Sequence, residues 1–181
     1  MILPWRDKRI GAGPYIPTSL TDNEASALWT MAPGQLVIEV GAAYGYSTIL
    51  MAQVAERVVS IDPHMGYGSL PNSLEIMRAN LEAYGVTDKV EVIHGQAAYE
   101  ALWEMSTHPT EQVGLVFIDG DHREDAVRRD VFCAMNLSRR IACHDYGEET
   151  CPDVRRVVDE MERLGTGPTR IVDTLWIREA A

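Results

Sequence analysis

Residues 37–50, VIEVGAAYGYSTIL, decide the fold, because a run of β-branched residues meets two glycines and then an amphipathic stretch. The run from Val37 to Val40 is typical of a strand buried on both faces of a parallel sheet. Gly41 and Gly45 let the backbone bend sharply and approach a ligand, and the helix that follows begins with free N–H groups. The stretch predicts a strand, a tight turn and a helix, with a ligand site where the strand ends.

Alternating apolar and amphipathic segments on either side of this stretch predict a doubly wound, mostly parallel α/β fold with helices on both faces. Further buried strands are predicted at residues 57–62, 90–97, 113–118 and 139–143, and two terminal strands at 169–172 and 175–177. Helices are predicted at residues 21–32, 47–56, 73–84, 98–105, 126–137 and 152–164. Right-handed crossovers place the strands at 37–40 and 113–118 side by side. The turns after residues 40, 118 and 143 should then open on one edge of the sheet.

Two side chains on these predicted helices receive specific roles. Trp103 is expected on the inner side of the helix at 98–105. Asp121 is expected to cap the amino end of the helix that starts near residue 122.

Length and composition indicate one domain. The chain has 181 residues, of which 46% are hydrophobic, as in an ordinary globular protein. We divide it into an N-terminal arm, residues 1–20, and a domain, residues 21–181. Prolines and glycines exclude regular structure from most of the arm.

Charge and cysteine content limit the partners. A net charge of −11 repels phosphate backbones and anionic membranes, so nucleic acid and membrane partners are not expected. The chain has no long apolar run, and its start carries charged residues where a signal peptide needs an apolar centre. Its three cysteines lack C-x-x-C spacing, so we expect reduced, mostly buried thiols in the cytoplasm.

The acid at the end of the second strand supports a nucleoside site. Asp62 lies about twenty residues beyond the glycine turn, where a carboxylate can accept hydrogen bonds from both ribose hydroxyls. A nicotinamide dinucleotide is disfavoured, because Ala43 occupies the place of the second glycine in the pattern G-x-G-x-x-G.

The stretch EVGAAYGYST, residues 39–48, resembles the first motif of class I S-adenosylmethionine (SAM) dependent methyltransferases. It is most similar to that of the small-molecule O-methyltransferases of the catechol and caffeoyl-CoA type and their macrolide-sugar relatives. The resemblance covers roughly residues 20–178 and implies a seven-stranded sheet closed by an antiparallel hairpin. It also implies SAM as the cofactor, with the binding residues Glu39, Gly41, Tyr44, Gly45, Ser47, Asp62, Gln96, Ala97 and Asp119. In this family an acidic or small polar residue usually occupies the place of Gln96.

Acids and histidines follow two neighbouring strands of the predicted sheet. Asp119 and His122 come after the strand at 113–118, and His144 and Asp145 come after the strand at 139–143. Methyl transfer to a hydroxyl requires that the oxygen lose its proton or have its pKa lowered by a metal. A histidine with a pKa near the working pH can take that proton, so His122 and His144 are the candidate catalytic residues.

The resemblance also implies a metal site. Carried over residue by residue, it makes Asp119, His144 and Asp145 ligands of a divalent ion and His122 the base. His144 departs from the acidic pair of the family: Mg²⁺ prefers oxygen ligands, whereas imidazole suits Mn²⁺, Zn²⁺ and similar ions better. A metal-assisted enzyme and a metal-free one that uses His122 or His144 both remain open.

The sequence as a whole predicts a SAM-dependent methyltransferase that acts on a hydroxyl of a small-molecule acceptor, which it does not identify. A non-catalytic SAM-binding or scaffold protein is the main alternative, and a nicotinamide-dependent oxidoreductase is the other. N-methylation also remains open. Apolar terminal strands are consistent with a homodimer.

Overall fold

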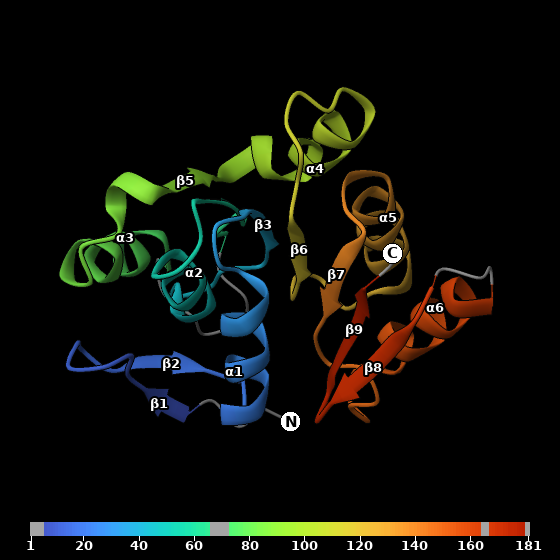
Figure 1. The fold of residues 1–181 in the computed structure, drawn as a ribbon, viewed down its shortest axis with the longest axis horizontal. Coiled ribbons are helices and arrows are strands. Elements are labelled where there is room, and N and C mark those ends of the chain that lie inside the picture. The colour runs from blue at the N-terminus through green and yellow to red at the C-terminus, as the bar shows by residue number, and fades with distance from the viewer. Residues whose placement is uncertain (1–5, 66–72, 164–166, 180–181) are drawn as a thin grey trace.

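The computed structural model describes residues 6–65, 73–163 and 167–179, and its main feature is a seven-stranded sheet (Figure 1). The strands in spatial order are β5 (Val90–Ile93), β4 (Arg57–Ile61), β3 (Leu36–Val40), β6 (Leu115–Ile118), β7 (Arg140–Cys143), β9 (Leu175–Glu179) and β8 (Thr169–Val172). The first five are parallel, and β9 and β8 form the antiparallel end. The expected pairing of β3 with β6 is confirmed, and it aligns Val40 with Ile118.

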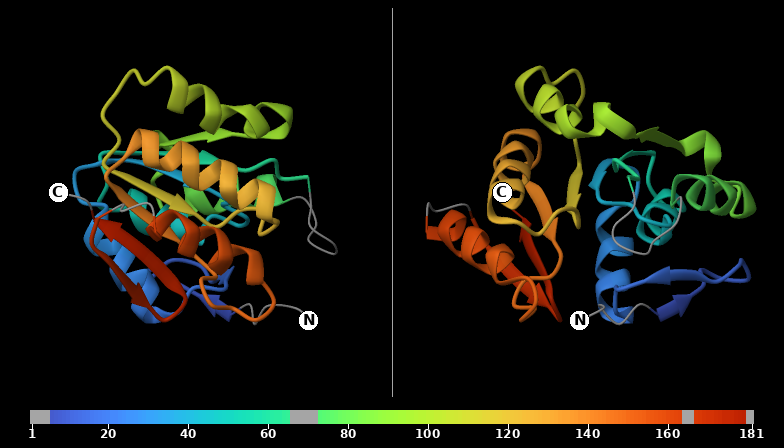
Figure 2. Two further views of the ribbon diagram at one scale, coloured as in Figure 1. Left: turned by 90° about the vertical axis from the view of Figure 1, so that its right-hand side faces the viewer. Right: turned by 180° about the vertical axis from the view of Figure 1, so that it is seen from behind.

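Helices cover both faces of this sheet (Figures 1 and 2). They are α1 (Asp22–Met31), α2 (Tyr46–Ala52), α3 (Ser73–Ala83), α4 (Ala98–Thr107), α5 (Glu124–Leu137) and α6 (Pro152–Arg163), with the short 3-10 turns η1 (Thr87–Lys89) and η2 (Gly95–Ala97). Adjacent residues of β3 point to opposite layers, as a strand requires. Val37 joins the buried cluster with α1, α2 and α3, whereas Ile38 joins the one with α4, α5 and α6.

The N-terminal arm has more order than its prolines and glycines indicate. β1 (Arg6–Lys8) and β2 (Ile16–Thr18) form an antiparallel pair, and Ile16 is fully buried in the cluster around α1 and α2. The Tyr84 hydroxyl accepts a hydrogen bond from the Ile10 N–H at 3.1 Å, which ties the arm to the end of α3. The described part of the arm therefore packs on the domain.

Some boundaries and one orientation differ from expectation. The helix α2 ends at Ala52 and the strand β5 ends at Ile93, both earlier than predicted. The expected inner position of Trp103 is wrong: its side chain is 50% exposed, and Ala101 and Leu102 face the sheet instead. The sequence also predicts a glycine-rich loop at residues 64–71, which lies mostly outside the described residues, as does the end of α6 expected at residue 164.

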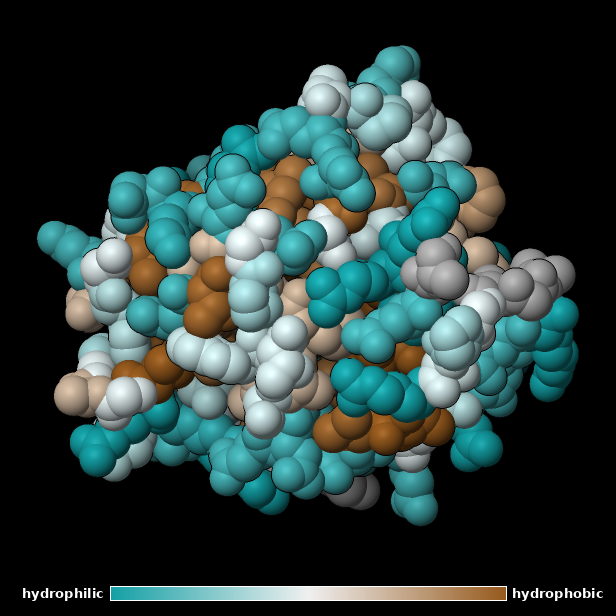
Figure 3. All heavy atoms as spheres, viewed as in Figure 1, coloured by the Kyte–Doolittle hydropathy of each residue, from teal (hydrophilic) through white to brown (hydrophobic). Residues whose placement is uncertain are grey.

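The surface is largely polar on the face shown in Figure 3, where apolar side chains occur as separate brown patches among teal and white ones. Within the described residues, no helix combines the length and the apolar character needed to cross a membrane.

A buried carboxyl ties the central strand to the helix after the glycine turn. The side chain of Glu39 is inaccessible to solvent, and it accepts hydrogen bonds from the hydroxyls of Ser47 and Thr48. The Ser60 hydroxyl on β4 donates a third, at 3.2 Å. Burial outweighs these bonds and raises the pKa of Glu39 to about 7. Around neutral pH, the carboxyl therefore holds a proton for a substantial part of the time.

Glu39 should make folding stability depend on pH. Its pKa is about 7 in the fold and near 4.5 in the unfolded chain, so its contribution is complete below pH 4.5 and is lost as the pH rises to about 7. The loss should be about 1.4 kcal/mol per pH unit. We expect Glu39→Gln to remove this slope in urea unfolding measured across this range, whereas Glu91→Gln, at an exposed position, should keep it. Parallel wild-type and Glu39→Gln curves would contradict this assignment.

Candidate functional site

The glycine turn between β3 and α2 packs directly against the end of β6. Gly41 has a φ of +90°, and a Cβ atom there would lie 2.0 Å from the backbone oxygen of Asp119. Gly45 has a φ of +86°, and a Cβ atom there would lie 2.9 Å from a side-chain carbon of Met77. Both positions require glycine. The close approach brings the predicted cofactor turn and the predicted acid cluster to one edge of the sheet.

Asp62 reaches this turn from the end of β4. Its Oδ2 atom accepts hydrogen bonds from the N–H groups of Ala42 at 2.9 Å and Ala43 at 2.8 Å. Its Oδ1 atom accepts one from the N–H of His64 at 2.7 Å. The side chain is 17% exposed, so the carboxylate lies at the turn with an edge open to solvent.

The other predicted cofactor residues lie at different depths. Ser47 is buried, and its hydroxyl donates a hydrogen bond to the carboxyl of Glu39. Tyr44 is also buried, and its backbone oxygen accepts a hydrogen bond from the side-chain amide of Asn80. Gln96 and Ala97 are exposed in η2. The preceding N–H of Gly95 donates to the backbone oxygen of Pro63 at 3.1 Å, which brings η2 beside the segment that carries Asp62.

The predicted catalytic and metal residues form one cluster. The Nδ1 atom of His144 lies 3.1 Å from Oδ1 of Asp119 and 3.3 Å from Oδ1 of Asp145. The Nε2 atom of His122 lies 2.8 Å from Oδ2 of Asp145 and 3.9 Å from Oδ1 of Asp119. Asp145 has a φ of +59°, in the left-handed region, where Asp is among the better tolerated residues. His144 and Asp145 are buried, and His122 is 31% exposed.

Glu24, on α1, supports this cluster from behind. Its Oε2 atom lies 3.3 Å from Nε2 of His144 and also accepts the N–H of Thr21, which completes the capping box at the start of α1. Its Oε1 atom accepts hydrogen bonds from the N–H and the hydroxyl of Thr174, in the turn between β8 and β9. Glu24 is fully buried, and it joins three segments of the chain.

Opposite charges set the protonation of the cluster. Burial opposes the charged form of each histidine, but Asp119 and Asp145 raise the pKa of His122 to about 10. Asp119, Asp145 and Glu24 together raise the pKa of His144 well above its usual value. Burial would raise the pKa of Glu24, yet its contacts with His144 lower it to about 2. The cluster therefore holds imidazolium groups among carboxylates at neutral pH.

The expected capping role of Asp121 is wrong. The helix α5 begins at Glu124, and its N-cap residue is Arg123. Asp121 accepts the N–H of Arg123 at 3.0 Å and pairs with the guanidinium of the same residue, so its carboxylate is engaged before the helix begins. The N–H of Glu124 is instead satisfied by Asp153 of α6 at 3.2 Å.

Sequence reasoning missed two residues that touch the cluster. Glu24 has capping-box spacing from Thr21, which by itself indicates only a helix cap, and no sequence pattern connects it with His144, 120 residues away. Cys151 was expected only as a buried thiol, but its Sγ atom lies within 4.8 Å of ligand atoms of His122 and Asp145. The short distance along the chain from Asp145 to Cys151 is the one signal that the sequence offers.

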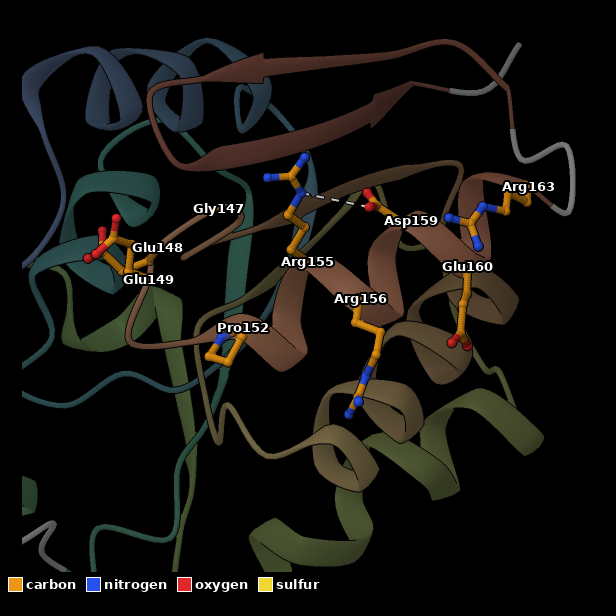
Figure 4. Close-up of a pocket in the computed structure, with 9 residues that line it drawn as sticks. All are labelled: Gly147, Glu148, Glu149, Pro152, Arg155, Arg156, Asp159, Glu160 and Arg163. Atoms are coloured by element: carbon orange, nitrogen blue, oxygen red, sulfur yellow. Dashed lines mark ion pairs between the residues drawn. The ribbon is translucent and has the colours of Figure 1, made fainter.

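An open groove lies along α6 (Figure 4). Residues 147–149 form one wall, and side chains of α6, including Arg155, Arg156 and Arg163, form the other. The residues that line it include none of the predicted site residues, so the groove does not contain the cluster.

Comparisons with known proteins identify the family of this chain. Residues 38–146 match the family described as "Methyltransferase domain". A catechol O-methyltransferase of Mycobacterium tuberculosis is 36% identical over 110 residues, which are 58% of this chain and 43% of the relative. A protein-L-isoaspartate O-methyltransferase of Methylorubrum populi is 35% identical over 95 residues, which are 50% of this chain and 40% of the relative. This chain thus matches less than half the length of either relative.

Solved structures confirm the fold. An O-methyltransferase from Bacillus cereus in complex with SAH aligns with a TM-score of 0.65 and 20% identity, over 87% of this chain and 80% of its own. The match to the family covers the glycine turn, Asp62, the acid and histidine residues after β6, and the pair after β7. The chain belongs to the methyltransferase domain family.

Proposed function

We propose that the chain is a SAM-dependent methyltransferase that transfers the methyl group to a hydroxyl of a small-molecule acceptor. The observation that carries this proposal is the contact between Gly41 and the backbone of Asp119. It brings the glycine turn beside the carboxylate and imidazole cluster, so a methyl donor bound at the turn would share one edge with the groups proposed to activate an oxygen. Membership of the methyltransferase family favours this reaction over the nicotinamide alternative.

The cofactor would lie along the glycine turn. Asp62 has two oxygen atoms with about four lone pairs, and three backbone N–H groups use only part of that capacity, so ribose hydroxyls can still donate to it. Gln96 and Ala97 are exposed beside this segment, where the Gln96 amide can meet an adenine edge. Glu39 and Ser47 would act through the shape of the turn, because their side chains bond to each other.

The cluster also fits a divalent cation. Asp119, His144 and Asp145 each offer one ligand atom, and these atoms lie within 4.8 Å of one another. With Nδ1 of His144 toward the ion, its Nε2 would donate to Glu24, and such outer carboxylates commonly orient metal-bound histidines. A cation held there would orient the acceptor hydroxyl and lower its pKa. The imidazole ligand favours Mn²⁺ or a similar ion over Mg²⁺.

His122 is the group proposed to take the proton of the acceptor. Its Nε2 atom is buried and faces the cluster, although the side chain as a whole is 31% exposed, so an acceptor bound at the cluster would meet this nitrogen there. The neighbouring carboxylates raise the pKa of this imidazole and keep it protonated. A positive charge bound at those carboxylates would lower the pKa again, and the deprotonated imidazole could then act as a base. The proton would then pass from the acceptor oxygen to Nε2 as the oxygen attacks the methyl carbon.

Further features of the molecule support the remaining assignments. We infer a cytoplasmic protein, because Cys133, Cys143 and Cys151 are free and buried thiols. The net charge of −11 disfavours nucleic acid as a partner. A homodimer is supported by the terminal strand β8, where the apolar side chain of Ile171 is 54% exposed.

Cofactor binding should depend on Asp62. We expect Asp62→Asn to weaken the affinity for S-adenosylhomocysteine at least tenfold, because the amide accepts fewer hydrogen bonds from a ribose and carries no charge. Calorimetric titration would measure this, with Asp88→Asn at an exposed position as the control, and thermal unfolding would verify the fold of each variant. Wild-type affinity in Asp62→Asn would remove this carboxylate from the cofactor site, and a wild-type protein that binds no S-adenosylhomocysteine would overturn the proposed function.

Methyl transfer should depend on His122. We expect His122→Ala to keep the affinity for S-adenosylhomocysteine and to lower the turnover of a hydroxylated acceptor by roughly 10² to 10⁴-fold, the usual contribution of a general base. His108→Ala changes an exposed histidine of the same chain and should have no effect. Unchanged turnover in His122→Ala would exclude this residue as the base. Cofactor binding without turnover in a broad acceptor screen would favour a non-catalytic protein.

Cation affinity should depend on Glu24. Glutamine also serves at this position of a capping box, so Glu24→Gln should preserve α1 while it removes the charge behind His144. We expect the affinity for Mn²⁺, measured by calorimetry, to fall by roughly 10 to 100-fold, as is typical when an outer carboxylate is lost. Glu82→Gln, at an exposed position, is the control. Equal affinities in both variants would argue against a cation bound through His144.

A further inference from the structure

Cys151 is fixed beside the cluster by the loop that joins β7 to α6. Its N–H donates to the backbone oxygen of Glu148 at 3.0 Å, and its own oxygen accepts the N–H of Val154 at 3.1 Å. The residue is only 6% exposed and directly precedes α6. The free N–H groups at the start of a helix favour a negatively charged atom at this place.

His122, Asp145 and Cys151 bring three different donor atoms together. One imidazole nitrogen, one carboxylate oxygen and the sulfur lie within 4.8 Å of one another. The Nε2 atom of His122 and the Oδ2 atom of Asp145 face each other at 2.8 Å. Both atoms are buried, and neither makes an aligned hydrogen bond with the residues that the structure describes. The two atoms are held as a charge pair, and a cation that displaces the proton between them would bond to both.

This donor set differs from the one formed by Asp119, His144 and Asp145. The Oδ1 atom of Asp145 faces His144 at 3.3 Å, whereas Oδ2 faces His122. The carboxylate can therefore offer a different oxygen to each set. Only the second set contains sulfur, and a combination of thiolate, imidazole and carboxylate ligands suits Zn²⁺ and does not suit Mg²⁺.

The set supplies three of the four ligands that a Zn²⁺ ion commonly takes. Zn²⁺ sites with an open position commonly have three protein ligands and a water molecule. The side chains of Asp145 and Cys151 are buried, but His122 is 31% exposed, so a cation can enter from its side. Binding would release the thiol proton of Cys151 and the Nε2 proton of His122 to solvent.

We propose that His122, Asp145 and Cys151 form a zinc site, and that Zn²⁺ bound there inhibits the enzyme because it occupies the Nε2 atom of His122. The binding part stands on these three side chains alone. The inhibitory part rests on the proposed function, in which the same nitrogen takes the acceptor proton.

Cobalt reports thiolate coordination directly. We expect the purified, reduced full chain to show a cobalt–thiolate charge-transfer absorption on addition of Co²⁺, and equimolar Zn²⁺ to remove it. Cys151→Ser should lose this absorption and weaken Zn²⁺ binding roughly tenfold or more. Cys133→Ser, which changes another buried cysteine, and Asp119→Asn, which changes the other donor set, should both keep it. No absorption in the wild type, or its persistence in Cys151→Ser, would overturn the site.

Inhibition is measured separately by methyl transfer in increasing Zn²⁺. We expect half-inhibition to require roughly tenfold more Zn²⁺ or greater in Cys151→Ser than in the wild type. If Zn²⁺ binds with the cobalt–thiolate signature and turnover is unaffected, the inhibitory role is wrong and the binding site stands. If no acceptor is methylated at all, the proposed function fails, and the cobalt measurement still decides whether the zinc site exists.

Discussion

The approach of the glycine turn to the end of β6 is the constraint on which the site depends. A Cβ atom at Gly41 would lie 2.0 Å from the backbone oxygen of Asp119, so any larger residue would push the two strand ends apart. The strand ends carry unlike chemistry: on one side the glycine turn and the Asp62 carboxylate, which we propose bind the nucleoside, and on the other side carboxylates with imidazoles. Because the backbones touch, these two functions are held at a fixed separation by the core of the sheet.

The cluster is built from distant parts of the chain, and Glu24 joins them. One carboxylate completes the cap of α1, accepts two hydrogen bonds from Thr174 and contacts His144. A fully buried carboxylate is costly unless it is paired and hydrogen-bonded. Here Oε2 accepts the N–H of Thr21 and pairs with His144, and Oε1 accepts two hydrogen bonds from Thr174. The arrangement links the orientation of His144 to the position of the first helix and of the terminal hairpin.

The sequence predicted the features that are local along the chain. The pairing of β3 with β6 followed from alternating segments and right-handed crossovers, and the family resemblance followed from the turn between β3 and α2. Trp103 was misplaced because a short helix with apolar residues on several sides does not define its inner face. Asp121 was misassigned because its carboxylate is bound by the backbone N–H and the guanidinium of Arg123, and not by the first N–H groups of α5. Glu24 and Cys151 were missed because their contacts with the cluster depend on tertiary packing, which no local pattern encodes.

The left-handed backbone of Asp145 restricts what this position can become. A φ of +59° is tolerated well by glycine, and by asparagine and aspartate among residues with a Cβ atom, and poorly by β-branched or bulky side chains. Two of those three residues carry a side-chain oxygen at the length needed to reach His122 and His144. Backbone geometry and site chemistry thus favour nearly the same residues. Substitutions that this backbone tolerates would either keep a side-chain oxygen that can face the two histidines or, with glycine, remove the side chain.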